Sequence, residues 1–470
     1  MKNYKQQFKG KKITIMGLGL LGRGLGYTKF LAECGADLIV TDLKPEKELE
    51  TSIKQLRKFA NPEGKSTSNG ASIQFVLGEH RLQDFKNRDM IIKNPGIPMD
   101  SIYIKEARKN NIPIEMDVSF FAKCAPDVMI IGVTGTRGKS MTTMLIHDIL
   151  KQNEKFLKHP STTLRTKKPT VFLGGNIRGV ATLPLLKQVQ PGDILVCELD
   201  SWQLQGFGEA KLSPQVSVFT TFMRDHMNYY KDDVDMYFED KANIFKYQKK
   251  GDALVILPKM KKLIKKNIKS KLIIANSKDV EKFDFVVPGV HQRENLACAF
   301  EVAKIFGIPE SKIKSAVKNF KGVEGRLQYV KTVKGVKIYN DNNATTPEAT
   351  IAGLEALSSA RFDLAEKKII LIAGGSDKKL DTKILANAVN KDCKEAIFLK
   401  GTGTESFLTN NTLRIPTEIV GNLKDAIAYA LKVAKKGDII LFSPAFASFG
   451  LFNNEYERND EFMKIVKKLK

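Results

Sequence analysis

Short apolar runs alternate with amphipathic stretches along nearly the whole chain. The runs at 13–16, 128–133 and 194–197 have the length of buried strands, and stretches with apolar residues at helical spacing separate such runs. Strands that alternate with helices are typical of α/β domains with parallel sheets. The chain has 470 residues, which at about 150 residues per domain predicts three domains. Their expected boundaries are 1–126, 127–325 and 326–470.

A glycine-rich loop follows the apolar run 128–133. Residues 135–140 read Gly-Thr-Arg-Gly-Lys-Ser, and a stretch with helical spacing begins directly after them. In such a loop, backbone N–H groups turn toward an anion and the new helix adds the positive end of its dipole. We expect Lys139 to reach the β- and γ-phosphates of a nucleotide and the Ser140 hydroxyl to hold Mg²⁺. Val133 stands where the usual pattern has glycine, so a helix N-terminus that happens to carry glycines is the alternative.

A second glycine-rich loop lies near the N-terminus. Residues 17–22 read Gly-Leu-Gly-Leu-Leu-Gly after a predicted strand, and Asp42 ends the next strand about twenty residues past the last glycine. This arrangement predicts a Rossmann-like domain whose backbone approaches a diphosphate and whose acid binds a ribose. It is also typical of NAD-dependent dehydrogenases, so an oxidoreductase stays an alternative. A further strand, 89–93, ends in Asn94-Pro95-Gly96.

The predicted central strands end in polar residues. Glu198 follows the run 194–197, and His226 follows Asp225 beyond a predicted strand at 216–220. Ligands of such sheets bind at the carboxyl ends of the strands, which makes Glu198 a candidate Mg²⁺ ligand. A solvated carboxylate is the alternative for Glu198, a core histidine for His226, and a solvated lysine for Lys241 on the predicted helix 235–247.

The C-terminal third repeats the alternation and predicts a second Rossmann-like domain. Before it, His291 and Asn295 lie at a predicted helix start, where they either cap the helix or contact an adenine. The expected strands of the third domain, each followed by a polar or glycine-bearing loop, are 335–340, 368–373, 396–399 and 438–442. The fold class is therefore α/β, with a P-loop ATPase domain between two Rossmann-like domains.

The amino-acid composition is that of a globular protein and argues against several other classes. Hydrophobic residues make up 42% and charged residues 27%, as in ordinary globular proteins, and no apolar run reaches the roughly 18 residues that span a membrane. The net charge of +24 permits nucleic-acid binding, but the lysines are spread along the chain without an aromatic-interleaved basic array. We favour a lysine-rich surface and no nucleic-acid partner. Five separated cysteines without a CxxC pair indicate a reduced, cytoplasmic protein without structural zinc.

Ten motifs in order along the chain resemble those of the Mur ligase family. They are GLGLLG, NPGIP, GVTGTRGKS, GGNIRG, ELDSWQLQ, RDHMNYY, PGVHQRENLACA, NDNNATTPEA, GGSDKK and SPAFASFGLF. The resemblance covers nearly the full chain and is greatest to the members that add D-glutamate to UDP-N-acetylmuramoyl-L-alanine.

The resemblance implies an ATP- and Mg²⁺-dependent amide ligase of peptidoglycan precursor synthesis, and with it a role in cell-wall biogenesis, cell shape and division. The three domains would bind, in order, the UDP-sugar, ATP and the incoming amino acid. ATP would convert a carboxylate to an acyl phosphate, which the amine then attacks, and catalysis would rest on charge neutralisation and positioning. A monomer is expected.

The family's functional residues carry over to matching positions. Catalytic roles fall to Lys139, Glu198, His226 and Lys241, the last as a carbamylated lysine. Metal ligands would be Ser140, Glu198, His226 and Lys241. ATP contacts would be Gly135, Thr136, Arg137, Gly138, Lys139, Ser140, His291, Asn295, Arg326 and Asp341. The UDP-sugar would meet Gly17, Leu18, Gly19, Leu20, Leu21, Asp42, Asn94, Gly96, Asn176, Ser201 and Gln203. The amino acid would meet Thr345, Lys378 and Ser448.

Several positions depart from the pattern of the D-glutamate-adding members. Asn343 stands where these have a lysine that helps to hold the substrate carboxylate, and their aromatic-then-glutamate pair is displaced to Glu455-Tyr456. Arg137 replaces a common asparagine, and the glycine loop also resembles that of poly-γ-glutamate synthetases. A Mur-type ligase for another amino acid, and a folylpolyglutamate or poly-γ-glutamate type of ligase, therefore stay alternatives.

Overall fold

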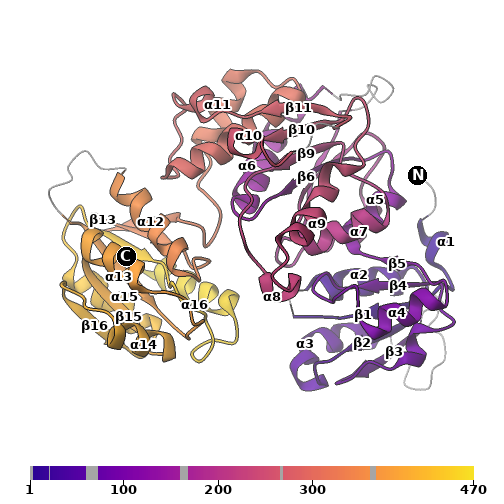
Figure 1. Ribbon diagram of the computed structural model, residues 1–470, viewed down its shortest axis with the longest axis horizontal. Coiled ribbons are helices and arrows are strands. Elements are labelled where there is room, and N and C mark those ends of the chain that lie inside the picture. Colours follow the sequence, from indigo (N-terminus) through magenta and orange to yellow (C-terminus); the bar gives the residue numbers. More distant parts are fainter. Residues whose placement is uncertain are drawn as a thin grey trace. The chain divides into compact units, whose positions relative to one another are not determined.

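The computed structural model describes residues 4–20, 22–59, 72–158, 168–264, 268–359 and 367–469. It divides into two compact units, Met1–Val280 with Asn295–Ala316, and Glu281–Glu294 with Val317–Lys470. The division runs through helix α10 (Val290–Ile305). Two sheets belong to the first unit and one to the second (Figure 1). The three predicted domain boundaries stay predictions.

The first sheet has five strands in the order β3-β2-β1-β4-β5, and every neighbouring pair is parallel. Its strands are β1 (Lys12–Met16), β2 (Asp37–Asp42), β3 (Ser72–Leu77), β4 (Met90–Lys93) and β5 (Ile114–Glu115). The helices of this part are α1 (Tyr4–Phe8), α2 (Arg23–Glu33), α3 (Glu46–Leu56), α4 (Ile102–Lys109) and α5 (Asp117–Cys124). Because β1 lies between β2 and β4, the loop after β1 sits at the centre of the carboxyl edge.

The second sheet has six parallel strands in the order β11-β10-β9-β6-β8-β7. The strands are β6 (Met129–Thr134), β7 (Val171–Gly175), β8 (Ile194–Glu198), β9 (Val216–Phe219), β10 (Ala253–Ile256) and β11 (Lys271–Ile274). The helices are α6 (Lys139–Gln152), α7 (Ser201–Glu209), α8 (Met227–Tyr230), α9 (Val234–Lys246), most of α10, and α11 (Glu310–Lys318).

The strand order of the second sheet reverses at β6. The crossover β6-α6-β7 runs toward one edge and β8-α7-β9 toward the other, so right-handed crossovers place α6 and α7 on opposite faces (Figure 1). Ligands of doubly wound sheets bind where the order reverses, outside the carboxyl ends of the strands. The glycine loop after β6 occupies that point.

The third sheet belongs to the second unit and has the order β12-β13-β17-β14-β15-β16. Its strands are β12 (Gln328–Val333), β13 (Val336–Asn340), β14 (Ile369–Gly374), β15 (Cys393–Leu399), β16 (Thr417–Val420) and β17 (Ile439–Phe442). Only β12, which the sequence pattern did not predict, pairs antiparallel within the described sheet. Lys334 and Gly335 join it to β13 with φ of 49° and 81°, the backbone of a two-residue hairpin turn.

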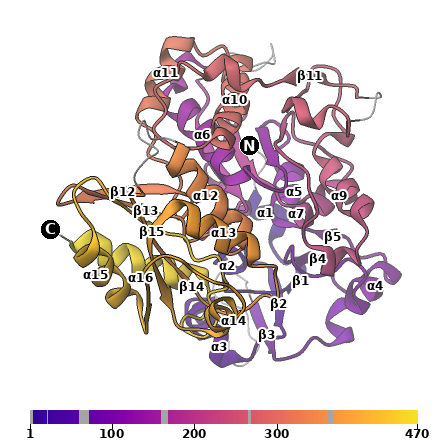
Figure 2. The same ribbon diagram turned by 60° about the vertical axis from the view of Figure 1, so that its left-hand side comes forward.

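Strand residues of the third sheet alternate between two hydrophobic cores. In β14, Ile369, Leu371 and Ala373 face one core and Ile370 and Ile372 face the other. The first core includes residues of α12 (Pro347–Ser359), α13 (Lys383–Asp392) and α14 (Thr402–Asn410), and the second those of α15 (Leu423–Val433) and α16 (Glu455–Lys468). Helices therefore cover both faces of this sheet (Figure 2).

Two properties expected from composition can be compared with the structure. Within the described ranges, no helix is long and apolar enough to cross a membrane. All five cysteines are free thiols.

The hydrophobic pattern of the sequence did not predict strands β3, β10, β11 and β16. Strand β11 is mostly exposed and therefore lacks a buried apolar run.

Candidate functional site

The glycine loop after β6 depends on its glycines for two close contacts. Gly135 and Gly138 have φ of 146° and 88°, in the region that side chains rarely adopt. A Cβ on Gly135 would lie 2.1 Å from Thr220 Oγ1, and one on Gly138 would lie 2.4 Å from Asn295 Oδ1. Asn295, on α10, is buried and also accepts a hydrogen bond from Thr142 Oγ1 at 3.3 Å. The glycine loop therefore packs tightly between the end of β9 and helix α10.

The segment after β9 holds the backbone of the glycine loop. The N–H groups of Thr136 and Arg137 donate to the carbonyl and the hydroxyl of Thr221, at 2.7 and 2.8 Å. The hydroxyl of Thr220 donates to the carbonyl of Arg137 at 2.6 Å. An anion would be held by the first turn of α6, where a helix N-terminus leaves N–H groups without intrahelical partners.

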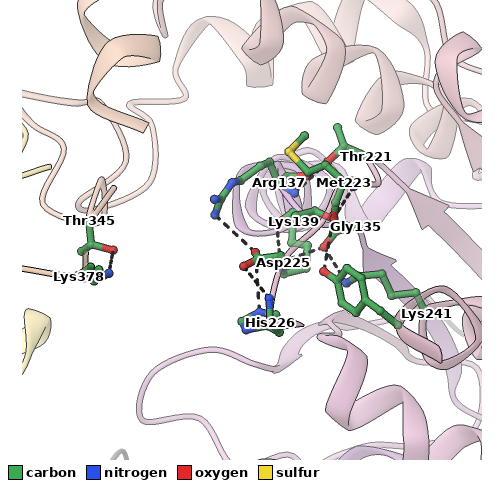
Figure 3. Close-up of polar contacts among 12 residues, drawn as sticks. Gly135, Arg137, Lys139, Thr221, Met223, Asp225, His226, Lys241, Thr345 and Lys378 are labelled. Atoms are coloured by element: carbon green, nitrogen blue, oxygen red, sulfur yellow. Dashed lines mark hydrogen bonds and ion pairs between the residues drawn. The ribbon is translucent and has the colours of Figure 1, made fainter. Parts of the chain in front are cut away.

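Two lysines converge on one carbonyl of the glycine loop. Lys139 Nζ donates to the carbonyls of Gly135 at 3.0 Å and Thr136 at 3.1 Å, and Lys241 Nζ donates to the carbonyl of Gly135 at 3.0 Å (Figure 3). Helix α9 places Lys241, which is 1% exposed. Burial, with a smaller contribution from the charge of Lys139, lowers the pKa of Lys241 to about 7. The structure therefore brings together two of the predicted catalytic residues.

His226 lies beside these lysines at the start of α8. Its φ is 56°, and its ring centroid lies 4.9 Å from that of Trp202. Asp225 Oδ2 lies 3.8 Å from His226 Nε2 (Figure 3). Burial lowers the pKa of His226; Asp225 opposes this shift, and the charges of Lys139 and Lys241 add to it. A neutral imidazole is the form that can ligate a metal or accept a proton.

Glu198 ends β8 and is buried. It pairs with Val133 of β6 and Gly175 of β7, and its carbonyl accepts the N–H of Asn176 at 2.7 Å. In the part of the chain that the structure describes, no group of three or more His, Cys, Asp or Glu side chains is placed to hold a metal ion. A site made of a serine hydroxyl, one strand-end carboxylate and nucleotide oxygens fits Mg²⁺, which keeps several waters and few protein ligands.

The first-sheet glycine loop is held by Asp42 and Asn94. Asp42 Oδ2 accepts the N–H of Gly19 and Oδ1 that of Lys44, both at 2.9 Å. A Cβ on Gly17, whose φ is 89°, would lie 2.9 Å from Asn94 Cβ. Asp42 therefore orders the loop, a role that the sequence pattern did not predict.

The remaining residues predicted for the UDP-sugar differ in exposure. Leu18 is buried and Leu20 is 52% exposed, while Leu21 lies outside the described residues. The Gly96 N–H donates to Asn94 Oδ1 at 3.4 Å. Ser201 and Gln203 are buried at the start of α7, where Gln203 and Asp200 form a reciprocal capping box.

In the second unit, the residues predicted to bind the amino acid line a cavity of about 250 Å³. It is lined by Arg326, Asn343, Thr345, Lys378, Ala447, Ser448, Phe449, Glu455 and Tyr456. Lys378 Nζ donates to Thr345 Oγ1 at 3.0 Å (Figure 3). All three residues predicted to bind the amino acid thus meet in one cavity.

The two other predicted nucleotide contacts of the second unit, His291 and Asp341, differ in solvent exposure. His291 is exposed in the first turn of α10, whereas Asp341 is buried at the end of β13. Asp341 accepts the Ser443 hydroxyl at 2.8 Å and the Leu327 N–H at 2.9 Å. Burial raises the pKa of Asp341 to about 7. In this structure its carboxylate ties β13 to β17.

Three family models together match most of the chain. "Mur ligase MurD-like, N-terminal domain" matches residues 11–115, "Mur ligase middle domain" 133–304, and "Mur ligase, glutamate ligase domain" 325–446. A relative from Borreliella burgdorferi (strain ZS7), named UDP-N-acetylmuramoylalanine--D-glutamate ligase, is 34% identical over 98% of this chain and 99% of its own length.

Solved structures show the same fold. UDP-N-acetylmuramate-alanine ligase MurC from Thermotoga maritima matches with a TM-score of 0.59 and 19% identity, over 98% of this chain and 100% of its own. The MurF ligase of the same organism, solved in complex with ADP, matches with a TM-score of 0.57 and 16% identity, over 99% and 97%. The chain belongs to the Mur ligase family, whose members are ATP-dependent amide-bond ligases, and the predicted three-domain α/β fold is confirmed.

Proposed function

We propose that this protein is a cytoplasmic enzyme of peptidoglycan precursor synthesis that uses ATP and Mg²⁺ to join D-glutamate to UDP-N-acetylmuramoyl-L-alanine. The observation that carries the proposal is the convergence of Lys139 and Lys241 on the Gly135 carbonyl, 3.0 Å from each amine. The relative from Borreliella burgdorferi, which is named for this substrate pair, supports the choice of substrates.

The nucleotide phosphates belong at the first turn of α6. Lys139 would leave the loop carbonyls of Gly135 and Thr136 and donate to the phosphates instead, a short movement for a flexible side chain. Two Mg²⁺ ions would neutralise phosphate charge. Ser140 is proposed to hold the first, and Glu198, His226 and carbamylated Lys241 the second. Lys241 fits because an amine with a pKa of about 7 is largely neutral just above that pH and can add CO₂ to become a carbamate.

The reaction has two displacements. A carboxylate oxygen of UDP-N-acetylmuramoyl-L-alanine attacks the γ-phosphorus of ATP, and ADP leaves. The amine of D-glutamate then attacks the acyl carbon, loses a proton and expels inorganic phosphate. The contribution of the chain is to position the reactants and to offset charge with Lys139 and the helix dipole.

The acceptor amino acid belongs in the cavity of the second unit. Lys378, Arg326 and the hydroxyls of Thr345 and Ser448 offer donors for carboxylate oxygens. The UDP of the other substrate belongs at the loop of residues 17–22 and near Asn94.

Phosphate release from the full-length protein tests the proposal. The protein would be incubated with ATP, Mg²⁺, UDP-N-acetylmuramoyl-L-alanine and one amino acid at a time. We expect D-glutamate to stimulate phosphate release and to yield a product one glutamyl residue heavier by mass spectrometry. No stimulation by any acidic amino acid would refute the D-glutamate assignment.

A Mur-type ligase for a different amino acid is the second candidate. Asn343 and Glu455, which depart from the pattern of the D-glutamate-adding members, both line the amino-acid cavity. The same panel separates the two functions, because a neutral or cationic amino acid would then give the larger stimulation. The oxidoreductase alternative does not hold, because the chain belongs to a family of amide-bond ligases.

A further inference from the structure

We propose that Asn343 is a specificity-determining donor to the side-chain carboxylate of the incoming amino acid, and that the buried Arg458 orients and polarises it through Asn342. This inference rests on the proposed function, because it assigns a role to residues around the same amino-acid cavity. The juxtaposition of Arg458, Asn342 and Asn343 carries it.

Arg458 is a buried cation that forms no ion pair among the described residues, although the charge of Glu455 acts on it from beyond ion-pair distance. The side chain is 1% exposed and lies on α16. Its guanidinium donates to Asn342 Oδ1 at 2.8 Å, to the Asn342 carbonyl at 3.0 Å and to the Phe446 carbonyl at 3.4 Å. Burial lowers the pKa of Arg458 to about 10, so it stays protonated at neutral pH. Burying a charge costs free energy unless hydrogen bonds and a nearby anion compensate for the loss of water.

The hydrogen-bond partners determine which end of the side-chain amides of Asn342 and Asn343 is the oxygen and which is the NH₂ group. A guanidinium only donates, so the Asn342 atom facing it must be the oxygen. The Asn342 amide nitrogen then donates to the Glu455 carbonyl at 2.9 Å and to Asn343 Oδ1 at 3.1 Å. Because the oxygen of Asn343 is used in this way, its NH₂ group is the end left to donate to a ligand. Successive donors in a low-dielectric environment polarise one another.

The backbone around Asn343 holds it at the cavity. Its N–H donates to the Gly325 carbonyl at 2.9 Å, and its carbonyl accepts the Thr345 N–H at 3.1 Å. Asn343 lines the cavity that also contains Arg326, Lys378 and Glu455.

The charges of the cavity agree with this role. Arg326 and Lys378 are positive and Glu455 is negative, so the lining carries one net positive charge. An acidic amino acid with a neutral attacking amine carries two carboxylates. Asn343 itself offers only a neutral donor. Arg458, which lies behind the lining, supplies the second positive charge.

Steady-state kinetics of the full-length protein test the proposal, with the KM for each of the three substrates measured separately. We expect Asn343→Ala and Arg458→Met each to raise the KM for D-glutamate about tenfold or more, because each removes a hydrogen bond to a charged group or its support. The KM values for ATP and UDP-N-acetylmuramoyl-L-alanine should stay within about twofold, since those substrates do not use this donor. Adding Asn343→Lys to Arg458→Met should restore most of the affinity for D-glutamate by placing the charge in the cavity directly. Arg414→Met, at an exposed arginine of the same unit, is the matched control.

The outcomes separate this inference from the proposed function. Wild-type turnover with D-glutamate establishes the function, and its absence overturns both. If the wild type turns over but Asn343→Ala leaves the KM for D-glutamate unchanged, the proposed function stands and this inference is overturned, because Arg458 acts only through Asn343. A parallel rise of all three KM values in Arg458→Met, or no recovery with Asn343→Lys, would reduce Arg458 to a structural residue and overturn the relay. Asn343→Ala alters a cavity side chain and keeps the test valid if Arg458→Met does not fold.

Discussion

At the scale of single residues, the proposed chemistry rests on amines whose environments differ. Lys139 begins α6 and reaches back to the loop carbonyls, whereas Lys241 is buried on α9 with a lowered pKa. Proximity of the two charges contributes to that lowering. Lys241 is thus suited to become a neutral amine, whereas Lys139 is placed at the start of α6 to contact phosphates.

The Lys139→Ala variant should lose turnover by about a thousandfold or more, because a preorganised cation at the phosphates is removed. Binding of the UDP-sugar, measured by isothermal titration calorimetry, should stay unchanged because Lys139 is not among the residues proposed to contact it. Lys151→Ala, on the last turn of the same helix and paired with Glu154, is the matched control. Near-normal turnover of Lys139→Ala would show that the glycine loop does not activate the carboxylate.

Lys241 should form a carbamate in a pH-dependent manner. Its folded-state pKa of about 7 lies below its ordinary value of 10.5, so the amine is mostly neutral above pH 7 and mostly protonated below it. Only the neutral amine adds CO₂, and the signal should therefore grow as pH rises through 7. NMR with ¹³C-bicarbonate would detect it. The signal should vanish in Lys241→Arg and persist in Lys246→Arg, a lysine of the same helix whose pKa is raised by Glu239. A signal that survives Lys241→Arg would place the carbamate elsewhere.

At the scale of elements, the site depends on how the end of β6 fits against its neighbours. The positive φ of Gly138 and the approach of Asn295 Oδ1 leave no room for a side chain between the glycine loop and α10. The third sheet shows a related dependence, because Arg458 on α16 supports the loop that follows β13. In both places a helix distant in sequence fixes a loop at a strand end.

The Gly138→Ala variant should be destabilised by about 1–3 kcal/mol, because alanine is strained at a φ of 88° and its Cβ would clash with Asn295. Thermal unfolding measured by circular dichroism would report the loss, and turnover should fall with it. Gly421→Ala is the control, since its Cβ would meet nothing within 4 Å and its φ is not positive. Equal melting temperatures for the two variants would contradict the close contact with α10.

At the scale of the whole molecule, the alternation of strands and helices is local in sequence, and it was predictable. The glycine loop with Lys139 and Ser140 is contiguous, so its place between a strand and a helix was predictable too. Contacts between distant segments were not: Thr221 meets Arg137 across 84 residues and Arg458 meets Asn342 across 116. Such pairs depend on strand order and helix placement, which periodicity does not encode. Lys241 alone reads as a solvated lysine, and only the family resemblance singled it out.

The division into two compact units makes a prediction about unfolding of the whole chain. Each unit has its own sheets and buried residues, so differential scanning calorimetry should resolve two transitions rather than one. UDP should raise the transition of the first unit only, because a ligand stabilises the state that binds it and the first glycine loop lies in that unit. Asn343→Ala, in the second unit, should leave the shift caused by UDP unchanged. A single transition that moves as a whole with UDP would show instead that α10, which passes from one unit to the other, couples their unfolding into one cooperative step.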